Sequence, residues 1–349
     1  MPPNPTIPRR ERATIEDVAS AAGVSVATVS RALRGLPNVA VPTRERIEKI
    51  AAELSYRADP AASRLAAGRS RAVAVAVPLL DGWYFAHVLA GAEAVFAEAG
   101  YDTIIVAVGA RGQGRHVLEN AGPISRRVDG LICVDLSLTD DELTRMRDER
   151  MEIVYVGRDN PAVPCLGIDD VEVGRIATAH LLDLGHRRIA TINGDQTDDP
   201  DDVVGFVVPH NRQQGYELAL LAASLPVDPA LSAPGYFTID GGYEATNRLL
   251  DLDDPPTAIF AFSDEMAFGA LWAARQRGVR VPEDLSVIGV DDHDVSKLLD
   301  LTTVHQDVDE HGARAARVMI DLLAGNEVPR ERENAPIRLI ERNTTAPRR

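Results

Sequence analysis

The chain has 349 residues, with 37 lysines and arginines against 53 aspartates and glutamates, and its net charge of −16 argues as a whole against nucleic-acid binding. The charge is unevenly spread, because residues 1–71 hold 12 basic and 7 acidic side chains while residues 72–349 hold 25 and 46. This reversal indicates two modules with different partners, a small basic head and a large acidic body. Of the two, only the head is suited to phosphate backbones.

The N-terminal segment and the cysteines bear on where the protein acts. Residues 1–12 are rich in proline and arginine, which predicts a disordered tail and no secretory signal. No run of eighteen apolar residues occurs, so a membrane-spanning helix is not expected. Cys133 and Cys165 stand apart in apolar surroundings, as buried thiols do in a reduced cytosol. We therefore expect a cytoplasmic protein without a membrane partner.

Residues 13–33 carry the signals of two short helices joined by a tight turn. Thr14 and Asp17 fit a capping box, which predicts that a helix begins at the next residue, Ile15. Gly23 suits the left-handed position that ends a helix, and Ser25 can cap a second helix over residues 26–33. Two helices joined in this way are typical of a helix-turn-helix, whose second helix enters the major groove of DNA.

A third helix is predicted from Pro42, because proline suits the first helical position. Ile47, Ile50 and Leu54 then repeat at helical spacing and would close a small three-helix core. The pattern predicts a DNA-binding domain over residues 13–58, although an ordinary helical hairpin would carry similar signals.

Residues 59–71 follow as a hinge or linker with the signals of a very short helix. Asp59 can cap it, Pro60 suits its first position and Gly68 would end it. A helix of about eight residues is marginal alone in water, so we expect this one to form only when DNA and a second copy of the chain support it. A plain linker is the alternative.

From residue 72 onward, short apolar runs alternate with helical stripes such as those before Gly100 and Gly185. This alternation predicts parallel sheets flanked by helices. Two such sheets facing each other would bind a ligand in the crevice at the carboxyl ends of their strands. The predicted strands are residues 72–78, 101–108, 130–134, 153–156, 188–192, 258–262 and 287–290.

The body carries no recognisable catalytic apparatus. The glycine-rich residues 109–114 lack the end of a phosphate-binding loop and are out of phase with a dinucleotide fingerprint. No Gly-x-Ser-x-Gly elbow occurs, and the histidines have no metal-ligand spacing. We therefore expect no enzyme activity, no catalytic residue, no metal and no cofactor. The acidic residues 195–202 are expected to form a solvated loop.

The motifs of both modules resemble those of the LacI/GalR repressor family. In the head, TIEDVA, AGVSVATVSRAL and LSY carry the resemblance. The body is similar over essentially all of residues 72–345, through the segments 184–190, 212–216, 262–270, 281–292 and 301–304. The resemblance implies a small all-α helix-turn-helix head plus an α/β body of two doubly wound parallel-sheet lobes of the periplasmic-binding-protein type.

The resemblance also implies how the effector-binding and dimerisation core is divided. The first lobe would comprise about residues 72–166 plus 305–330, and the second about residues 167–304 plus 331–345. The two lobes would exchange strands through three crossovers, one of them near Thr302 and Thr303.

For the head, the resemblance implies which residues meet DNA. Val26 and Ala27 would contact base edges, and Arg31 could donate two hydrogen bonds to a guanine. Leu65 of the hinge would wedge open a step of the minor groove. The usual Pro-Asn of the family is Ala58-Asp59 here, which puts a carboxylate near phosphates. The implied DNA contacts are Thr14, Ser25, Val26, Ala27, Thr28, Ser30, Arg31, Arg64 and Leu65.

For the effector, the resemblance places an arginine fork at Arg212 and a carboxylate at Asp291, which together can clamp vicinal hydroxyls. Aromatic rings such as Phe85 and Phe237 can stack on the C–H face of a sugar or on a base, although Phe85 could instead begin a core-facing helix stripe. The implied effector contacts are Trp83, Tyr84, Phe85, Arg158, Arg212, Phe237, Ser263, Asp264 and Asp291.

Two departures and two alternatives qualify this site. Ser263 stands where asparagine is usual, and Gly157-Arg158 stands where Asp-Arg is common, which favours a different sugar or an unusual effector. Arg212 could instead form a surface salt bridge on its helix, and Asp291 could cap the helix that follows it.

These features predict a homodimeric, ligand-controlled DNA-binding regulator, a repressor of carbohydrate-use genes that binds a palindromic operator. A small molecule, a sugar or similar, would bind in the interlobe cleft and change operator affinity by preferring one arrangement of the lobes. The alternatives are a cytoplasmic sugar-binding protein without regulatory DNA binding, a purine-type regulator that depends on a corepressor, and an enzyme built on the same fold.

Overall fold

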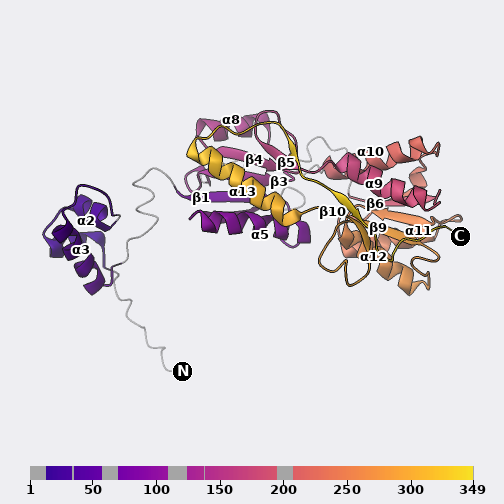
Figure 1. Cartoon of the computed structure of the whole chain (residues 1–349), viewed down its shortest axis with the longest axis horizontal. Helices are drawn as coiled ribbons and strands as arrows, with labels where there is room; N and C mark the ends of the chain where they lie inside the picture. The colour runs from indigo at the N-terminus through magenta and orange to yellow at the C-terminus, as the bar shows by residue number, and fades with distance from the viewer. Residues whose placement is uncertain are drawn as a thin grey trace, which may run out of the picture. The chain divides into compact units, whose positions relative to one another are not determined.

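The computed structural model describes residues 13–33, 35–56, 70–108, 124–136, 138–194 and 207–348. The chain divides into two compact units at residues 70 and 71, which closely match the basic head and the acidic body. Figure 1 shows helices in the head and two α/β lobes in the body. Among the described residues, no helix is both long and apolar enough to cross a membrane.

The head is a bundle of short helices around a small apolar core. Its helices are α1 (Ile15–Ala22), α2 (Val26–Leu33) and α3 (Val41–Glu53). Val18, Val29 and Ile47, one from each helix, are fully buried and lie in one cluster. Each helix therefore depends on the other two for its stability, and the predicted helix-turn-helix head is confirmed.

The first lobe of the body is a six-stranded parallel sheet, in the order β11-β5-β4-β3-β1-β2. Its elements are β1 (Ala72–Val77), α5 (Trp83–Glu98), β2 (Asp102–Ala107), β3 (Gly130–Val134), α8 (Asp140–Asp148), β4 (Glu152–Val156), β5 (Cys165–Gly167), α13 (Val308–Ala324) and β11 (Glu333–Asn334). Alternate residues of β1 enter opposite cores, the valines toward α5 and α13 and the alanines toward α8, so helices cover both faces (Figure 1).

The second lobe has a sheet of the same size, in the order β12-β10-β9-β8-β6-β7, in which only β12 is antiparallel to its neighbour. Its elements are α9 (Asp170–Asp183), β6 (Ile189–Asn193), α10 (Val207–Ala222), η1 (Pro229–Leu231), β7 (Ser232–Pro234), α11 (Ile239–Leu250), β8 (Ala258–Ala261), α12 (Asp264–Gln276), β9 (Ser286–Asp291), β10 (Thr302–His305) and β12 (Arg338–Ile340). Helix α9 pairs with α10, and α11 pairs with α12, on opposite sides of the sheet (Figure 1). The predicted fold class is confirmed.

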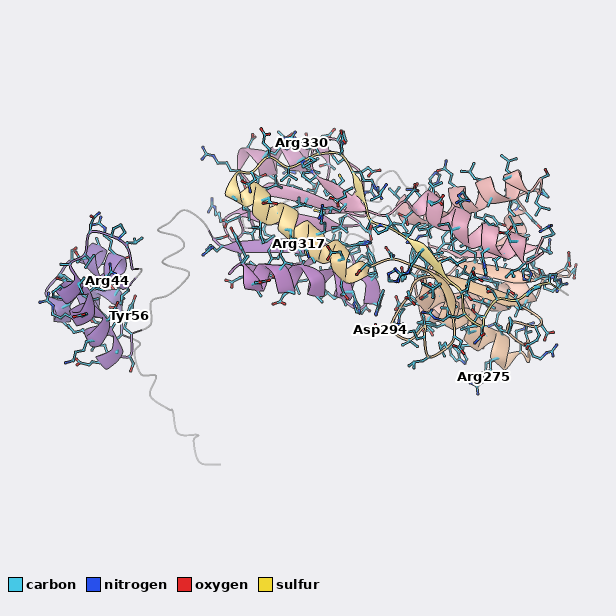
Figure 2. All side chains as sticks on the ribbon, in the orientation of Figure 1. Arg44, Tyr56, Arg275, Asp294, Arg317 and Arg330 are labelled. Atoms are coloured by element: carbon cyan, nitrogen blue, oxygen red, sulfur yellow. The ribbon has the colours of Figure 1, made fainter. Side chains whose placement is uncertain are left out.

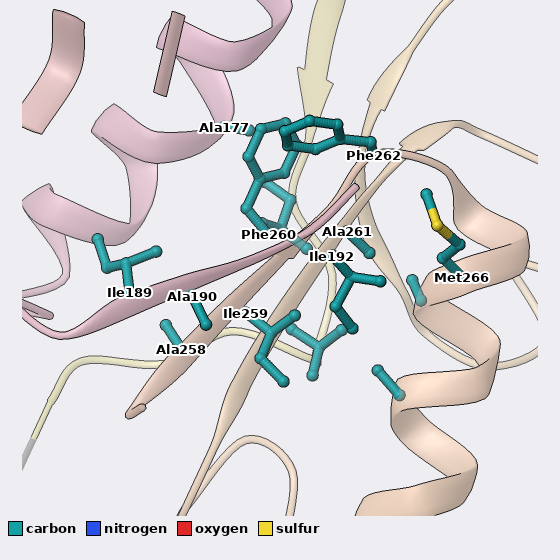
Figure 3. Close-up of a cluster of buried hydrophobic side chains, with 14 of the residues drawn as sticks. Ala177, Ile189, Ala190, Ile192, Ala258, Ile259, Phe260, Ala261, Phe262 and Met266 are labelled. Carbon is teal, nitrogen blue, oxygen red and sulfur yellow. The ribbon is translucent and has the colours of Figure 1, made fainter. Parts of the chain in front are cut away.

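The centre of the second lobe is aromatic and aliphatic. Figure 3 shows Phe260 and Phe262, whose ring centroids lie 4.9 Å apart, with Ile192 and Met266 in the same cluster. Phe262 directly follows β8 and is fully buried. The packing of Phe262 therefore fixes the carboxyl end of β8 in place.

The chain passes between the lobes after β5, after β10 and after β11. Thr302 and Thr303 lie in β10, just before the second passage. Strand β11 pairs with β5 in the first lobe, whereas the sequence analysis assigned residues 331–345 to the second lobe. A two-residue strand has no hydrophobic pattern that could have located this boundary.

The predicted strands agree with β1, β2, β3, β4, β6, β8 and β9 to within one residue at each end. The strands that the sequence analysis missed, β5, β7, β10, β11 and β12, have only two to four residues each. Such short segments take their structure from neighbouring strands more than from their own sequence.

Helices α5 and α13 approach each other closely through glycines. A Cβ at Gly91 would overlap the carbonyl of Asp309, and a Cβ at Gly312 would overlap the carbonyl of Val88. A side chain at either position would therefore force the two helix backbones apart.

Candidate functional site

The exposed start of α2 is the candidate DNA-binding surface of the head. The Ser25 hydroxyl caps this helix, since it accepts a hydrogen bond from the Thr28 N–H at 3.2 Å and lies 2.9 Å from the Thr28 hydroxyl. Val26, Ala27 and Arg31 are exposed, while the opposite side of the helix is buried. The exposed residues can thus meet a groove without disturbing the core.

The other DNA contacts implied by the sequence divide into two groups. Thr14 is exposed at the start of α1, where its hydroxyl accepts from the Asp17 N–H at 3.3 Å, and Ser30 is half-buried in α2. Arg64 and Leu65 lie outside the described residues, as do most of the hinge and the whole tail, glycine-rich and acidic segments at residues 1–12, 109–114 and 195–202.

The body contains a cavity of about 420 Å³ that is lined by residues of both lobes. In the first lobe, Leu79, Asp135 and Gly157 follow β1, β3 and β4. In the second lobe, Ser263 follows β8 and Asp291 ends β9. The cavity therefore lies at the carboxyl ends of both sets of parallel strands, where open α/β sheets bind their ligands.

Six of the nine implied effector residues line this cavity, namely Tyr84, Phe85, Arg212, Phe237, Ser263 and Asp291. Trp83, Arg158 and Asp264 are not among the described residues of its wall. The Ser263 hydroxyl also caps α12 by accepting from the Met266 N–H at 3.3 Å.

Asp264 instead supports the loop behind the cavity. Its carboxylate accepts hydrogen bonds from the Ser296 hydroxyl at 2.6 Å, the Thr303 hydroxyl at 2.7 Å and the His293 N–H at 2.9 Å. Burial and the neighbouring Asp291 raise the pKa of Asp264. With its acceptors occupied, Asp264 positions the segment that follows Asp291.

Arg212 is held by a buried ion pair. Its Nε donates to Asp170 Oδ1 at 2.9 Å, and its Nη1 donates to the backbone carbonyl of Phe262. Arg212 and Asp170 are each 4% exposed. Burial raises the pKa of Asp170, and Arg212 acts in the opposite direction. The arginine fork is thus fixed before any ligand arrives.

Asp291 accepts a side-chain hydrogen bond at the crossover between the lobes and a further hydrogen bond from the Asp264 backbone. Gln306 Nε2 donates to Asp291 Oδ1 at 2.6 Å, and both residues line the cavity. Burial raises the pKa of Asp291 to about 6, while Arg212 lowers it. The backbone of Asp291 has a φ of 117°, a region that side chains rarely adopt and that is often found at functional sites.

Asp135 is a buried carboxylate in the first-lobe wall. It is 5% exposed, and its Oδ1 has no hydrogen-bond partner among the described residues. Burial and Asp170 raise the pKa of Asp135 to about 7, while Arg158 and Arg212 lower it. A Cβ at Gly157 would overlap Asp135 Oδ1, so any other residue at position 157 would require the carboxylate to move.

His311 of α13 lies in the same wall. It is 3% exposed, and neither ring nitrogen has a hydrogen-bond partner in the described part of the chain. Burial lowers the pKa of His311 to about 4, so the ring is neutral near pH 7. A neutral imidazole offers one donor and one acceptor.

Trp83 lies at the lobe junction and contacts the second lobe. Its indole Nε1 donates to Asp294 at 3.2 Å, and its ring makes tilted contacts with His87 and His293 at centroid distances of 4.2 and 4.6 Å. Figure 2 shows Asp294 at the side of the second lobe that is nearest the first. Glu265 accepts a hydrogen bond from the Trp83 backbone, and burial raises the pKa of Glu265 to about 7.

The effector residues implied by the sequence do not include Asp135, Asp170, Gln306 or His311, which also line the cavity. Asp135 directly follows the predicted strand 130–134, so its place at a strand end was a usable signal. Asp170 follows β5, which is too short to predict, and His311 lies within a helix where nothing in the sequence indicates a cavity. Among the described residues, no three His, Cys, Asp or Glu side chains gather as metal ligands.

Comparison with known families identifies both modules. Residues 14–59 match the family described as bacterial regulatory proteins, lacI family, and residues 178–345 match the periplasmic binding protein-like domain. The HTH-type transcriptional repressor CytR of Escherichia coli (strain K12) is 35% identical over 320 residues, which cover 90% of this chain and 91% of the repressor. The HTH-type transcriptional regulator CelR of Thermobifida fusca is 36% identical and covers 95% of this chain and 96% of the regulator.

Two solved structures extend this similarity to three dimensions. A CelR–cellobiose complex has a TM-score of 0.69 at 33% identity, covering 95% of this chain and all of that one. A lac repressor dimer bound to operator and an anti-inducer has a TM-score of 0.81 at 27% identity, covering 96% of this chain and all of that one.

Proposed function

Because the chain belongs to the lacI family of bacterial regulatory proteins, DNA-binding regulators that respond to small molecules, we propose that it represses carbohydrate-use genes and responds to a sugar or similar ligand. The observation that carries this proposal is the cavity, which combines aromatic rings with a fixed arginine and several carboxylates. Rings that cover C–H faces beside groups that bind hydroxyls are the usual features of sugar sites.

On the DNA side, α2 enters the major groove of each half of a palindromic operator. Ser25, Thr28 and Ser30 contact phosphates or groove edges, and Val26, Ala27 and Arg31 meet bases. Exposure of the start of α2 and of Arg31 supports this assignment. The hinge adds a minor-groove contact through Leu65.

On the ligand side, Arg212 and Asp291 clamp neighbouring hydroxyls of the effector. Phe85 and Phe237, both in the cavity wall, cover its apolar face. Tyr84 and Ser263 complete the contacts with further hydroxyl groups. The similarity to a regulator solved with cellobiose supports a carbohydrate as the effector.

The regulator acts in the cytoplasm as a homodimer, which the similarity to a lac repressor dimer on its operator supports. The effector binds one arrangement of the two lobes more tightly than the other, and the ratio of these two affinities sets the upper limit of its effect on operator affinity. Two heads bound one helical turn apart would together hold the operator far more tightly than one.

A gel-shift experiment with the DNA that flanks the gene tests this function. The full chain is expected to bind, and a chain of residues 71–349 is expected to lose all binding. Ribose, glucose or cellobiose should change the affinity of the full chain, whereas hypoxanthine tests the purine-type alternative. Equal DNA binding by the truncated chain would overturn the proposal.

A further inference from the structure

The first-lobe wall of the cavity holds two buried polar side chains that the described protein does not satisfy. Asp135 and His311 are 5% and 3% exposed, and both line the cavity. Asp135 Oδ1 and both ring nitrogens of His311 lack hydrogen-bond partners among the described residues. Since an unpaired buried polar atom destabilises a fold, groups of this kind in a cavity wall call for a ligand.

Space for the Asp135 carboxylate depends on one glycine. Gly157 follows β4, beside the end of β3, and has a φ of 83°. Its missing Cβ leaves the volume that Asp135 Oδ1 occupies. A side chain at position 157 and the carboxylate of Asp135 would therefore occupy the same volume of the wall. In this chain the Asp135 carboxylate occupies it.

The charges around the cavity restrict the ligand. Asp135, Asp170, Asp291 and Glu265 all line it, whereas Arg212 is the cation of the described wall and is already paired with Asp170. A phosphate or carboxylate on the ligand would face these acidic groups at close range in a poorly solvated space. Hydroxyl and amino groups would instead donate to them.

We propose that Asp135 accepts a hydrogen bond from a hydroxyl or amino group of the effector and that His311 also contacts the effector. The effector is then a sugar or amino sugar without an anionic group. The proposal deepens the proposed function, on which it rests, by naming a specificity-determining carboxylate and the ligand chemistry that it selects.

Calorimetry on the full chain tests the proposal with glucose, ribose, cellobiose and glucosamine, and with the anions glucose 6-phosphate and gluconate. At least one uncharged or amino sugar is expected to bind, and neither anion. At pH 8, above the Asp135 pKa of about 7, Asp135→Asn should weaken that binding by about tenfold or more, because a hydrogen bond to a charged acceptor is lost. Asp148→Asn, an exposed change in α8 of the same lobe, should bind like the unaltered chain.

The melting temperature without ligand separates a ligand role from a structural one. An unpaired buried carboxylate does not stabilise the fold, so Asp135→Asn and His311→Leu should melt at or above the temperature of the unaltered chain. A structural role for Asp135 would instead lower it. Gly157→Ala gives an independent route, because its Cβ would displace the carboxylate and weaken binding of the same sugar.

The effect of Gly157→Ala on the melting temperature should be smaller in an Asp135→Ala background, where the overlap is absent. The strain of a positive φ is common to both backgrounds and cancels in the comparison. An equal fall in melting temperature in the two backgrounds would contradict the inference that the residue 157 Cβ and the Asp135 carboxylate compete for the same volume.

The outcomes also separate this inference from the proposed function. Sugar binding within about twofold of the unaltered chain in Asp135→Asn, binding of an anion alone, or binding of none of the uncharged or amino sugars would overturn the inference. Loss of DNA binding on truncation would still support the regulator. DNA binding that persists without the head would overturn the proposed regulatory function, irrespective of the results with sugars.

Discussion

The two walls of the cavity differ in how completely their polar groups are satisfied. In the second lobe, Arg212 is held by Asp170 and by a backbone carbonyl, and Asp291 receives a hydrogen bond from Gln306. In the first lobe, Asp135 Oδ1 and the His311 ring have no partner within the described chain. One wall is therefore prebuilt, and the other is completed by whatever binds.

This difference suits a protein that responds to its ligand through lobe movement. A prebuilt wall captures the ligand without the cost of ordering new side chains. Under the proposed function, a wall with unpaired groups gains hydrogen bonds only when the ligand reaches it, and we expect these bonds to favour the arrangement in which both walls contact the ligand. Substitutions in the second-lobe wall should thus lower the stability of the fold, whereas substitutions in the first-lobe wall should mainly lower ligand affinity.

The largest expected effect comes from breaking the prebuilt wall. Arg212→Ala removes the partner of Asp170 and leaves a carboxylate that is 4% exposed, whose pKa burial raises and Arg212 no longer lowers. Loss of one partner of a buried ion pair costs about 3–5 kcal/mol of unfolding free energy. Urea denaturation of the full chain, followed in the body by tryptophan fluorescence, measures this loss.

Arg280→Ala provides the matched control. Arg280 pairs with Asp284 at 2.7 Å on the surface, so its loss should leave the unfolding midpoint unchanged. Comparable destabilisation by the two substitutions would show that the buried pair has no special weight.

The next effect is a pH dependence of the incomplete wall. The pKa of Asp135 is raised to about 7, so the folded chain binds its proton more tightly than the unfolded chain does. The stability that this proton contributes is present below pH 4 and is lost as the pH rises through about 7. The free energy of unfolding of Asp135→Asn, relative to that of the unaltered chain, should therefore rise by about 1–3 kcal/mol between pH 4 and pH 7.5.

Denaturation at pH 4.5, 6 and 7.5 measures this gain, since the difference between the variant and the unaltered chain should widen at each step. Asp148→Asn should show the unaltered slope, because this exposed residue does not line the cavity. Parallel pH curves for Asp135→Asn and the unaltered chain would contradict a buried, unpaired carboxylate.

The smallest expected effect concerns the contact between Trp83 and Asp294, which joins the two lobes. Asp294→Asn replaces the charged acceptor of the Trp83 indole, which lies 3.2 Å away in the other lobe. The site is largely exposed, so we expect the substitution to change the free energy of bringing the two lobes together by about 0.2–1 kcal/mol. The ligand affinity should then fall by less than about fivefold. Asp300→Asn, in the same loop, is the control, and an identical response of both variants would argue against the contact.

Most of the fold could be predicted from the sequence because its long elements carry strong periodic signals. The capping box at Thr14, the glycine at position 23 and the valine-rich run of β1 each specify local structure independently of the rest. Strands β5, β11 and β12 could not be predicted, since each has two or three residues and exists through pairing with a neighbour.

The candidate site was predictable only in part, and the reason is geometric. Arg212 and Asp291 lie in recognisable motifs, whereas Asp170 becomes important because folding places it 2.9 Å from Arg212, 42 residues along the chain. Asp135 follows a predicted strand, yet its significance depends on a missing side chain at Gly157. Such a pairing of a charge with an empty volume appears only in three dimensions.

The glycine contacts between α5 and α13 join these two helices of the first lobe into one rigid unit. Because no layer of side chains separates the backbones at Gly91 and Gly312, the two helices have little room to slide and must move together. His311, beside Gly312, belongs to the cavity wall, and α5 follows directly on β1, the first strand after the hinge. We therefore expect a ligand that displaces His311 to move α13 and α5 together, because the close backbone contact leaves little space for α13 to shift alone.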